Sequence, residues 1–131
     1  MNTWRIGILT LIVVVVLIAL TQMNSKKELE SKIDLALAGE HRSEKNKNRD
    51  QYRHPMETLS FFGLETNFTV LEITPGGGWY TEVLAPVMRD DGTLHAAIYN
   101  INDDSRPIIK KLDKIFRGLL ASRPDVFDQV E

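Results

Sequence analysis

The chain contains no cysteine, so it forms no disulfide bond and offers neither a thiolate metal ligand nor a cysteine nucleophile. It also lacks an excess of one charge, because 16 lysine and arginine residues are balanced by 18 aspartate and glutamate residues. This balance argues against nucleic acid as a main partner. The sequence has no lysine-bearing phosphate loop and no Ser-His-Asp arrangement. His41, His54 and His95 are scattered without an acidic partner at metal-ligand spacing, which favours structural roles and no metal site.

The first long feature that is present is an uncharged apolar run at residues 6–20, behind Arg5 and ahead of Lys26 and Lys27. Extended to Met23, the uncharged stretch has 18 residues, at the lower edge of a membrane span of roughly 20 residues, and it equally fits the core of a signal peptide. Ala19-Leu20-Thr21 is a poor cleavage site, so we expect residues 1–24 to form an uncleaved transmembrane anchor. The alternative is signal cleavage, which would leave a periplasmic or secreted protein. Basic residues on both sides leave the orientation open.

Residues 25–54 are interpreted as a helical and charged linker. Apolar residues recur at helical spacing up to Ala38, Ser25 and Glu28 resemble a capping box that would begin this helix, and Gly39 would end it. Residues 41–53 are heavily charged, which predicts a solvated helix face or linker. An edge role in a ligand pocket is the alternative.

Residues 55–131 are typical of an α/β domain. An apolar strand is expected at residues 69–74, a helix at 79–88 and a second strand at 93–99. The intervening stretch is long enough for a parallel pair with one crossover helix. A further helix follows Pro107, and residues 129–131 look like the start of a third strand.

The turn after the first strand carries a family resemblance. The string Glu72-Ile73-Thr74-Pro75-Gly76-Gly77-Gly78 resembles motif I of the class I S-adenosylmethionine-dependent methyltransferases. It is most similar to a bacterial group of predicted methyltransferases, usually exported, with Arg-Asp-x-Tyr-Arg-His-Pro-x-Glu-Thr-Leu ahead of Pro-Gly-Gly-Gly-Trp-Tyr-Thr-Glu. Residues 49–59 and 75–82 fit both strings, and the resemblance runs from about residue 42 to residue 131. It implies the N-terminal portion of a Rossmann-like methyltransferase fold, with two parallel strands and flanking helices.

The resemblance implies S-adenosylmethionine as cofactor. The N–H groups of Gly76, Gly77 and Gly78 would cradle its carboxypropyl end, and Glu72 would position it indirectly. Thr74, followed by Pro75, replaces the first glycine of the general motif, as in the bacterial group, and its Cβ narrows the approach to the cofactor.

Ribose recognition departs further from the pattern. The acid that accepts both ribose hydroxyls would fall near Ile98, which accepts no hydrogen bond, so Tyr99 and Asn100 are the substitutes. Trp79 and Tyr80 are expected to pack in the core rather than stack on a ligand.

These observations lead to two functional hypotheses. The chain holds fewer strands than a class I methyltransferase sheet, so we expect a methyltransferase-like product of a truncated or split gene, inactive alone, with an unknown methyl acceptor. The alternative is a non-enzymatic membrane-tethered module that self-associates or pairs with another chain through an unpaired strand edge. The resemblance places the protein in the bacterial inner membrane, with a single span at residues 6–20 and an exported soluble part.

Overall fold

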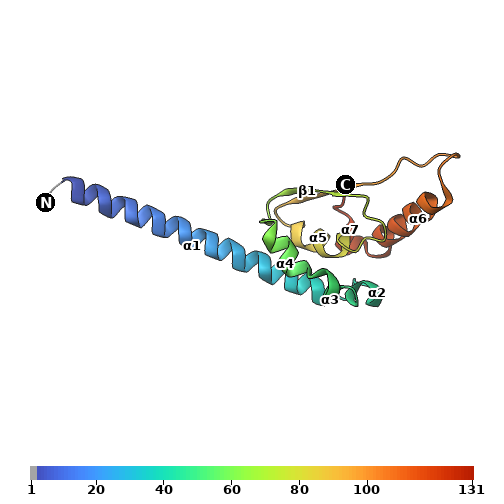
Figure 1. The fold of residues 1–131 in the computed structure, drawn as a ribbon, viewed down its shortest axis with the longest axis horizontal. Helices are drawn as coiled ribbons and strands as arrows, with labels where there is room; N and C mark the ends of the chain where they lie inside the picture. The colour runs from blue at the N-terminus through green and yellow to red at the C-terminus, as the bar shows by residue number, and fades with distance from the viewer. Residues whose placement is uncertain (1–2) are drawn as a thin grey trace.

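A computed structural model describes residues 3–131 of the chain, and all structural statements refer to these residues (Figure 1). It shows an α/β protein with a two-stranded parallel sheet and a long helix that projects from the rest of the molecule. This helix, α1 (Thr3–Ala38), has 36 residues. No proline or glycine interrupts it between residues 8 and 38, and it ends where the Gly39 N–H donates to the Ala36 carbonyl at 3.1 Å.

The continuity of α1 corrects the expected helix start at Ser25, which lies inside the helix and caps nothing. An N-cap needs a non-helical residue, and the helix continues on both sides of Ser25. Residues 6–24 of α1 are exposed, whereas Leu29, Ile33 and Ala36 are buried in the core. One helix therefore serves as both the apolar segment and a wall of the domain.

Three short helices follow: α2 (Glu44–Lys47), α3 (Asp50–Arg53) and α4 (Pro55–Phe61). Ser43 caps α2 by accepting a hydrogen bond from the Asn46 N–H at 3.3 Å. His54 joins α3 to α4 with a left-handed backbone, and Pro55 occupies the first turn of α4 as expected.

The sheet pairs β1 (Thr69–Ile73) with β2 (Thr93–Ala97) in parallel, and Thr69 lies opposite Thr93. The crossover helix is α5 (Thr81–Met88). This confirms the expected strand–helix–strand order, although both strands are shorter than predicted. Val130 makes an isolated parallel bridge to Leu94 on the other edge of β2, so the expected start of a third strand is also present.

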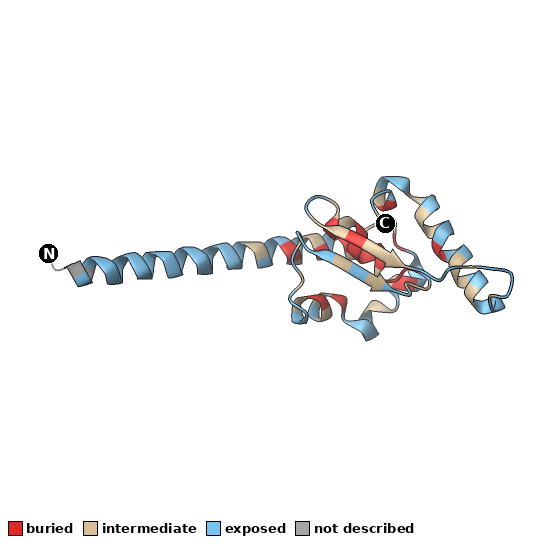
Figure 2. Cartoon of the chain, turned by 90° about the horizontal axis from the view of Figure 1, so that it is seen from above, coloured by how far each residue is buried: buried red, intermediate tan, exposed pale blue. Residues whose placement is uncertain are grey.

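The last two helices are α6 (Pro107–Ser122) and α7 (Pro124–Phe127). The core lies on one side of the sheet, where α5 packs between the strands and the second half of α1 (Figure 2). Leu71 and Ile73 point away from this core and are 59% and 70% exposed. One face of β1 is therefore apolar and uncovered within the described residues.

Candidate functional site

The glycine-rich turn after β1 has a regular backbone pattern. Thr74, Gly76 and Gly78 have φ angles of 55°, 62° and 76°, so every second residue is left-handed. The Thr74 N–H donates to the Ala97 carbonyl at 2.9 Å and fixes the turn to the end of β2. Left-handed backbone is accessible to glycine and costly for a β-branched residue such as threonine. The turn therefore adopts a conformation suited to glycine at three alternate positions, although one of them is threonine.

The three glycines differ in their surroundings. A Cβ added at Gly78 would collide with Leu119, so glycine at this position lets α6 pack on the turn. A Cβ at Gly77 would meet no atom within 4 Å, and one at Gly76 only the Thr74 carbonyl oxygen at 3.9 Å. Within residues 3–131, neither the Gly76 nor the Gly77 N–H has a hydrogen-bond acceptor. These two amides are therefore available to a ligand.

A cleft of about 190 Å³ lies beside the turn, between the end of β2 and α6. Thr74, Pro75 and Gly76 line it on one side and Tyr99 on another, whereas Asn100 is not part of its lining. The remaining lining residues come from the β2 end and from α6: Ile98, Ile109, Leu112, Asp113 and Phe116. Four of the eight predicted site residues thus surround one largely apolar cleft.

Asp113 lines the cleft and was not among the predicted site residues. Its side chain is only 16% exposed, and both carboxylate oxygens accept hydrogen bonds from the Arg117 Nε at 3.0 Å. The sequence feature that could have predicted it is its position next to Leu112 and three residues before Phe116. At helical spacing, this position places a carboxylate at the border of the buried stripe of α6. Asp113 is the only carboxylate lining this cleft among the described residues.

Glu72 lies outside the cleft. Its Oε2 accepts a hydrogen bond from the Thr81 Oγ1 at 2.6 Å, at the first residue of α5. Burial raises the pKa of the Glu72 carboxyl, and hydrogen bonding from Thr81 opposes part of this rise. Glu72 instead borders a groove of about 330 Å³ along β1, together with apolar residues that include Phe62 and Tyr80. The structure thus joins Glu72 to the start of α5 and does not place it beside the glycines.

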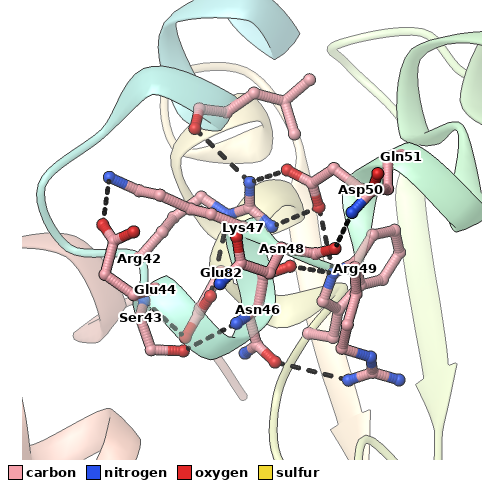
Figure 3. Close-up of polar contacts among 12 residues, drawn as sticks. Arg42, Ser43, Glu44, Asn46, Lys47, Asn48, Arg49, Asp50, Gln51 and Glu82 are labelled. Atoms are coloured by element: carbon pink, nitrogen blue, oxygen red, sulfur yellow. Dashed lines mark hydrogen bonds and ion pairs between the residues drawn. The ribbon is translucent and has the colours of Figure 1, made fainter.

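Most residues of the charged segment at 41–53 are exposed, as predicted, but the buried Arg42 attaches the segment to α5 (Figure 3). Arg42 has no exposed side-chain surface and donates to both carboxylate oxygens of Asp50, with an Nη2–Oδ1 distance of 2.9 Å. Its Nε lies 3.6 Å from the buried Glu82 Oε2. The His41 Nε2 lies 2.7 Å from the Glu82 carbonyl oxygen. The sequence did not predict this attachment, because Glu82, the carboxylate near Arg42, is distant from the segment in the sequence.

Trp79 connects the two strings that carry the family resemblance. Its Nε1 donates to the Asn46 carbonyl at 3.0 Å and lies 3.1 Å from the Asp50 Oδ1. The Arg53 guanidinium lies 4.8 Å from the Trp79 ring centroid, within cation–π range. The indole is 3% exposed, so it packs in the core and presents no face to the cleft. Trp79 therefore joins the segment that carries Asp50 and Arg53 to the residues that follow the glycine-rich turn.

No group of three or more His, Cys, Asp or Glu side chains able to hold a metal ion occurs in the part of the chain that the structure describes. Comparison of the chain with protein-family models, with curated proteins and with solved structures gave no significant match.

Proposed function

We propose that this chain is a membrane-anchored, S-adenosylmethionine-dependent methyltransferase-like protein whose glycine-rich turn binds the amino-acid end of the cofactor. The supporting observation is the alternating left-handed backbone at Thr74, Gly76 and Gly78, at the carboxyl end of the first strand of a parallel β-α-β unit. Ligands of open α/β sheets bind at this position. The free amides of Gly76 and Gly77 precede the N-terminus of α5, where the helix dipole favours a carboxylate.

In this proposal, the nucleoside part of the cofactor binds in the cleft beside the turn. Its apolar walls suit a base, and the Tyr99 hydroxyl and the Asp113 carboxylate are hydrogen-bonding groups for a sugar. Methyl transfer from a sulfonium requires little acid–base chemistry and depends mainly on positioning. The lining offers no residue that identifies a methyl acceptor. Because Ile98 stands where the resembling family places its ribose-binding acid, we expect millimolar cofactor binding and no methyl transfer by this chain alone.

Amide chemical shifts of the full chain in detergent micelles, measured during titration with S-adenosylmethionine, would test this proposal. We expect the largest shifts at Gly76, Gly77 and Asp113. Gly77→Ala adds a methyl group that meets no protein atom, and it should weaken binding at least tenfold. Gly118→Ala in α6 also adds a methyl group in open space and serves as the matched control. Unchanged binding by Gly77→Ala, or no shift at the turn at millimolar cofactor, would contradict the proposal.

A second function, a membrane-tethered module that self-associates through its sheet, is favoured by the uncovered β1. Thr69, Leu71 and Ile73 are exposed, and no described residue pairs with the outer edge of this strand. Such an edge is a template for pairing with another strand. Sedimentation of the full chain in detergent should then show a dimer that Leu71→Lys converts to a monomer. The control is Leu35→Lys, at an exposed position on α1. A monomeric wild-type chain would exclude this function.

A further inference from the structure

Two exposed aromatic residues end α4. Phe61 and Phe62 are 85% and 76% exposed, and their rings contact each other edge to face with centroids 5.5 Å apart. Neither belongs to the core, although Leu59 of the same helix is buried. A contiguous pair of large apolar side chains on a surface marks an interaction site.

The position of this pair relative to the membrane follows from its neighbours. A groove of about 540 Å³ separates α1 from the end of α4. It is lined on the α1 side by Thr21, Gln22, Ser25, Lys26 and Leu29, and on the other side by Ser60, Gly63, Leu64 and Glu65. The residues next to Phe61 and Phe62 therefore face the stretch of α1 between positions 21 and 29.

A bilayer crossed by the apolar part of α1 would end at this stretch. The part of α1 between residues 6 and 23 is uncharged and exposed, and it is apolar enough to cross a membrane. At about 1.5 Å per residue it spans about 27 Å, close to the roughly 30 Å of the hydrocarbon layer. Lys26 and Lys27 then fall in the headgroup layer, where their ammonium groups meet lipid phosphates. In Figure 1, the end of α4 is the part of the domain nearest the projecting half of α1.

We propose that Phe61 and Phe62 insert into the boundary between headgroups and acyl chains of the bilayer that α1 spans. Phenylalanine side chains of peripheral helices occupy this depth. The domain then has two attachments to one membrane, the span and the aromatic pair, and its rotation about α1 is restricted. Because β1 starts near α4 and ends at the glycine-rich turn, this turn lies at the end of β1 that is farther from the aromatic pair (Figure 1). This inference rests on the membrane anchor of the proposed function and is independent of cofactor binding.

Because the chain has no cysteine, a single introduced cysteine can be spin-labelled without removing others. A nitroxide would be attached to Phe62→Cys in the full chain, reconstituted in phosphatidylcholine–phosphatidylglycerol vesicles, and to Tyr52→Cys on α3 as the exposed control. We expect the label at position 62 to collide more often with oxygen than with a water-soluble nickel complex, and the label at position 52 to show the reverse. Equal nickel accessibility at the two positions would overturn the proposal.

A second measurement places the label outside the aromatic pair. The label is moved to Glu65→Cys, which lines the groove beside them, and is compared with and without Phe61→Ser and Phe62→Ser. Loss of the aromatic anchors should raise the nickel accessibility of this label several-fold. An unchanged value would show that the aromatic pair does not hold the domain to the membrane.

Discussion

Thr74 is the most unusual residue of the glycine-rich turn. A left-handed backbone costs an L-amino acid roughly 1–2 kcal/mol, and β-branching makes this conformation rarer still. The conformation is imposed by the hydrogen bond from its N–H to Ala97 and by the turn that follows. Such an outlier at the end of a strand supports a functional origin of the turn.

Replacing Thr74 by glycine should therefore stabilise the protein. The relief of strain exceeds the cost of about 0.5–1 kcal/mol that glycine adds through the unfolded chain, leaving a net gain of up to about 1 kcal/mol. Thr69→Gly, at an extended position in β1, should instead destabilise by a similar amount. Urea unfolding of the full chain in mild detergent, followed by near-UV circular dichroism, separates the two. A loss of stability in both variants would show that Thr74 is not strained.

The second prediction at the residue scale concerns Arg42. Its guanidinium is buried between Asp50 and Glu82, and removal of one member of a buried ion pair leaves charges without a partner. Arg42→Ala should lower the free energy of unfolding by about 3–5 kcal/mol. The control is Arg117→Ala, which removes the ion pair between Arg117 and Asp113. Because the Arg117 side chain is 63% exposed, this variant should lose at most about 1 kcal/mol of the free energy of unfolding. The same urea experiment checks both, and equal losses would contradict the role of burial.

Glu72 gives the stability a dependence on pH. Because burial raises its pKa above the ordinary 4.5, the folded state holds this proton more tightly than the unfolded state. The Glu72 contribution is therefore most favourable below pH 4.5 and falls as pH rises towards the raised pKa, above which the loss stays constant. Glu72→Gln keeps an acceptor for Thr81 and removes the charge, so its stability relative to wild type should increase over this window. A difference that is independent of pH would contradict the raised pKa.

At the scale of whole elements, α1 joins the exposed apolar segment to the domain core. Ile33 is fully buried, whereas Leu35, two residues away, is 71% exposed. Ile33→Ala should lower the free energy of unfolding by about 2–5 kcal/mol, because it leaves a cavity between α1 and α5. Leu35→Ala changes the same helix without a cavity and should have little effect. If both variants were as stable as wild type, α1 would not be part of the domain.

The elements predicted best were those specified by local sequence. The strand pair, its parallel direction and the crossover helix followed from apolar runs, turn residues and connection length. The continuity of α1 through Ser25 did not, because a capping pattern is also compatible with a helix interior when both flanks are helical. The site was predicted only in part. The turn was visible as Gly76 to Gly78, but the position of Asp113 depends on how α6 packs, and that is set by contacts such as Leu119 on Gly78.

For the whole molecule, the continuous helix bears on whether the N-terminal segment is kept. The sequence left a transmembrane anchor and a cleaved signal as alternatives. In the structure the candidate cleavage region at residues 19–24 is helical and continues without a break to Leu29 and Ile33 in the core. A protease that cuts beside the membrane needs an extended segment, and unwinding this one would disturb the helix that supports α5.

We therefore expect the full-length chain to stay in the membrane fraction after carbonate washing, with its N-terminus intact by mass spectrometry. Val14→Lys combined with Val15→Lys should abolish this retention, because each charge at the centre of a span costs about 2.5–3.5 kcal/mol in insertion. Val14→Leu combined with Val15→Leu is the apolar control and should behave as wild type. Retention by the lysine variant would mean that another surface, such as the aromatic pair at the end of α4, holds the chain to the bilayer. A mature chain that begins between residues 21 and 24 would instead show that the segment is a signal peptide and that the domain keeps only the second half of α1.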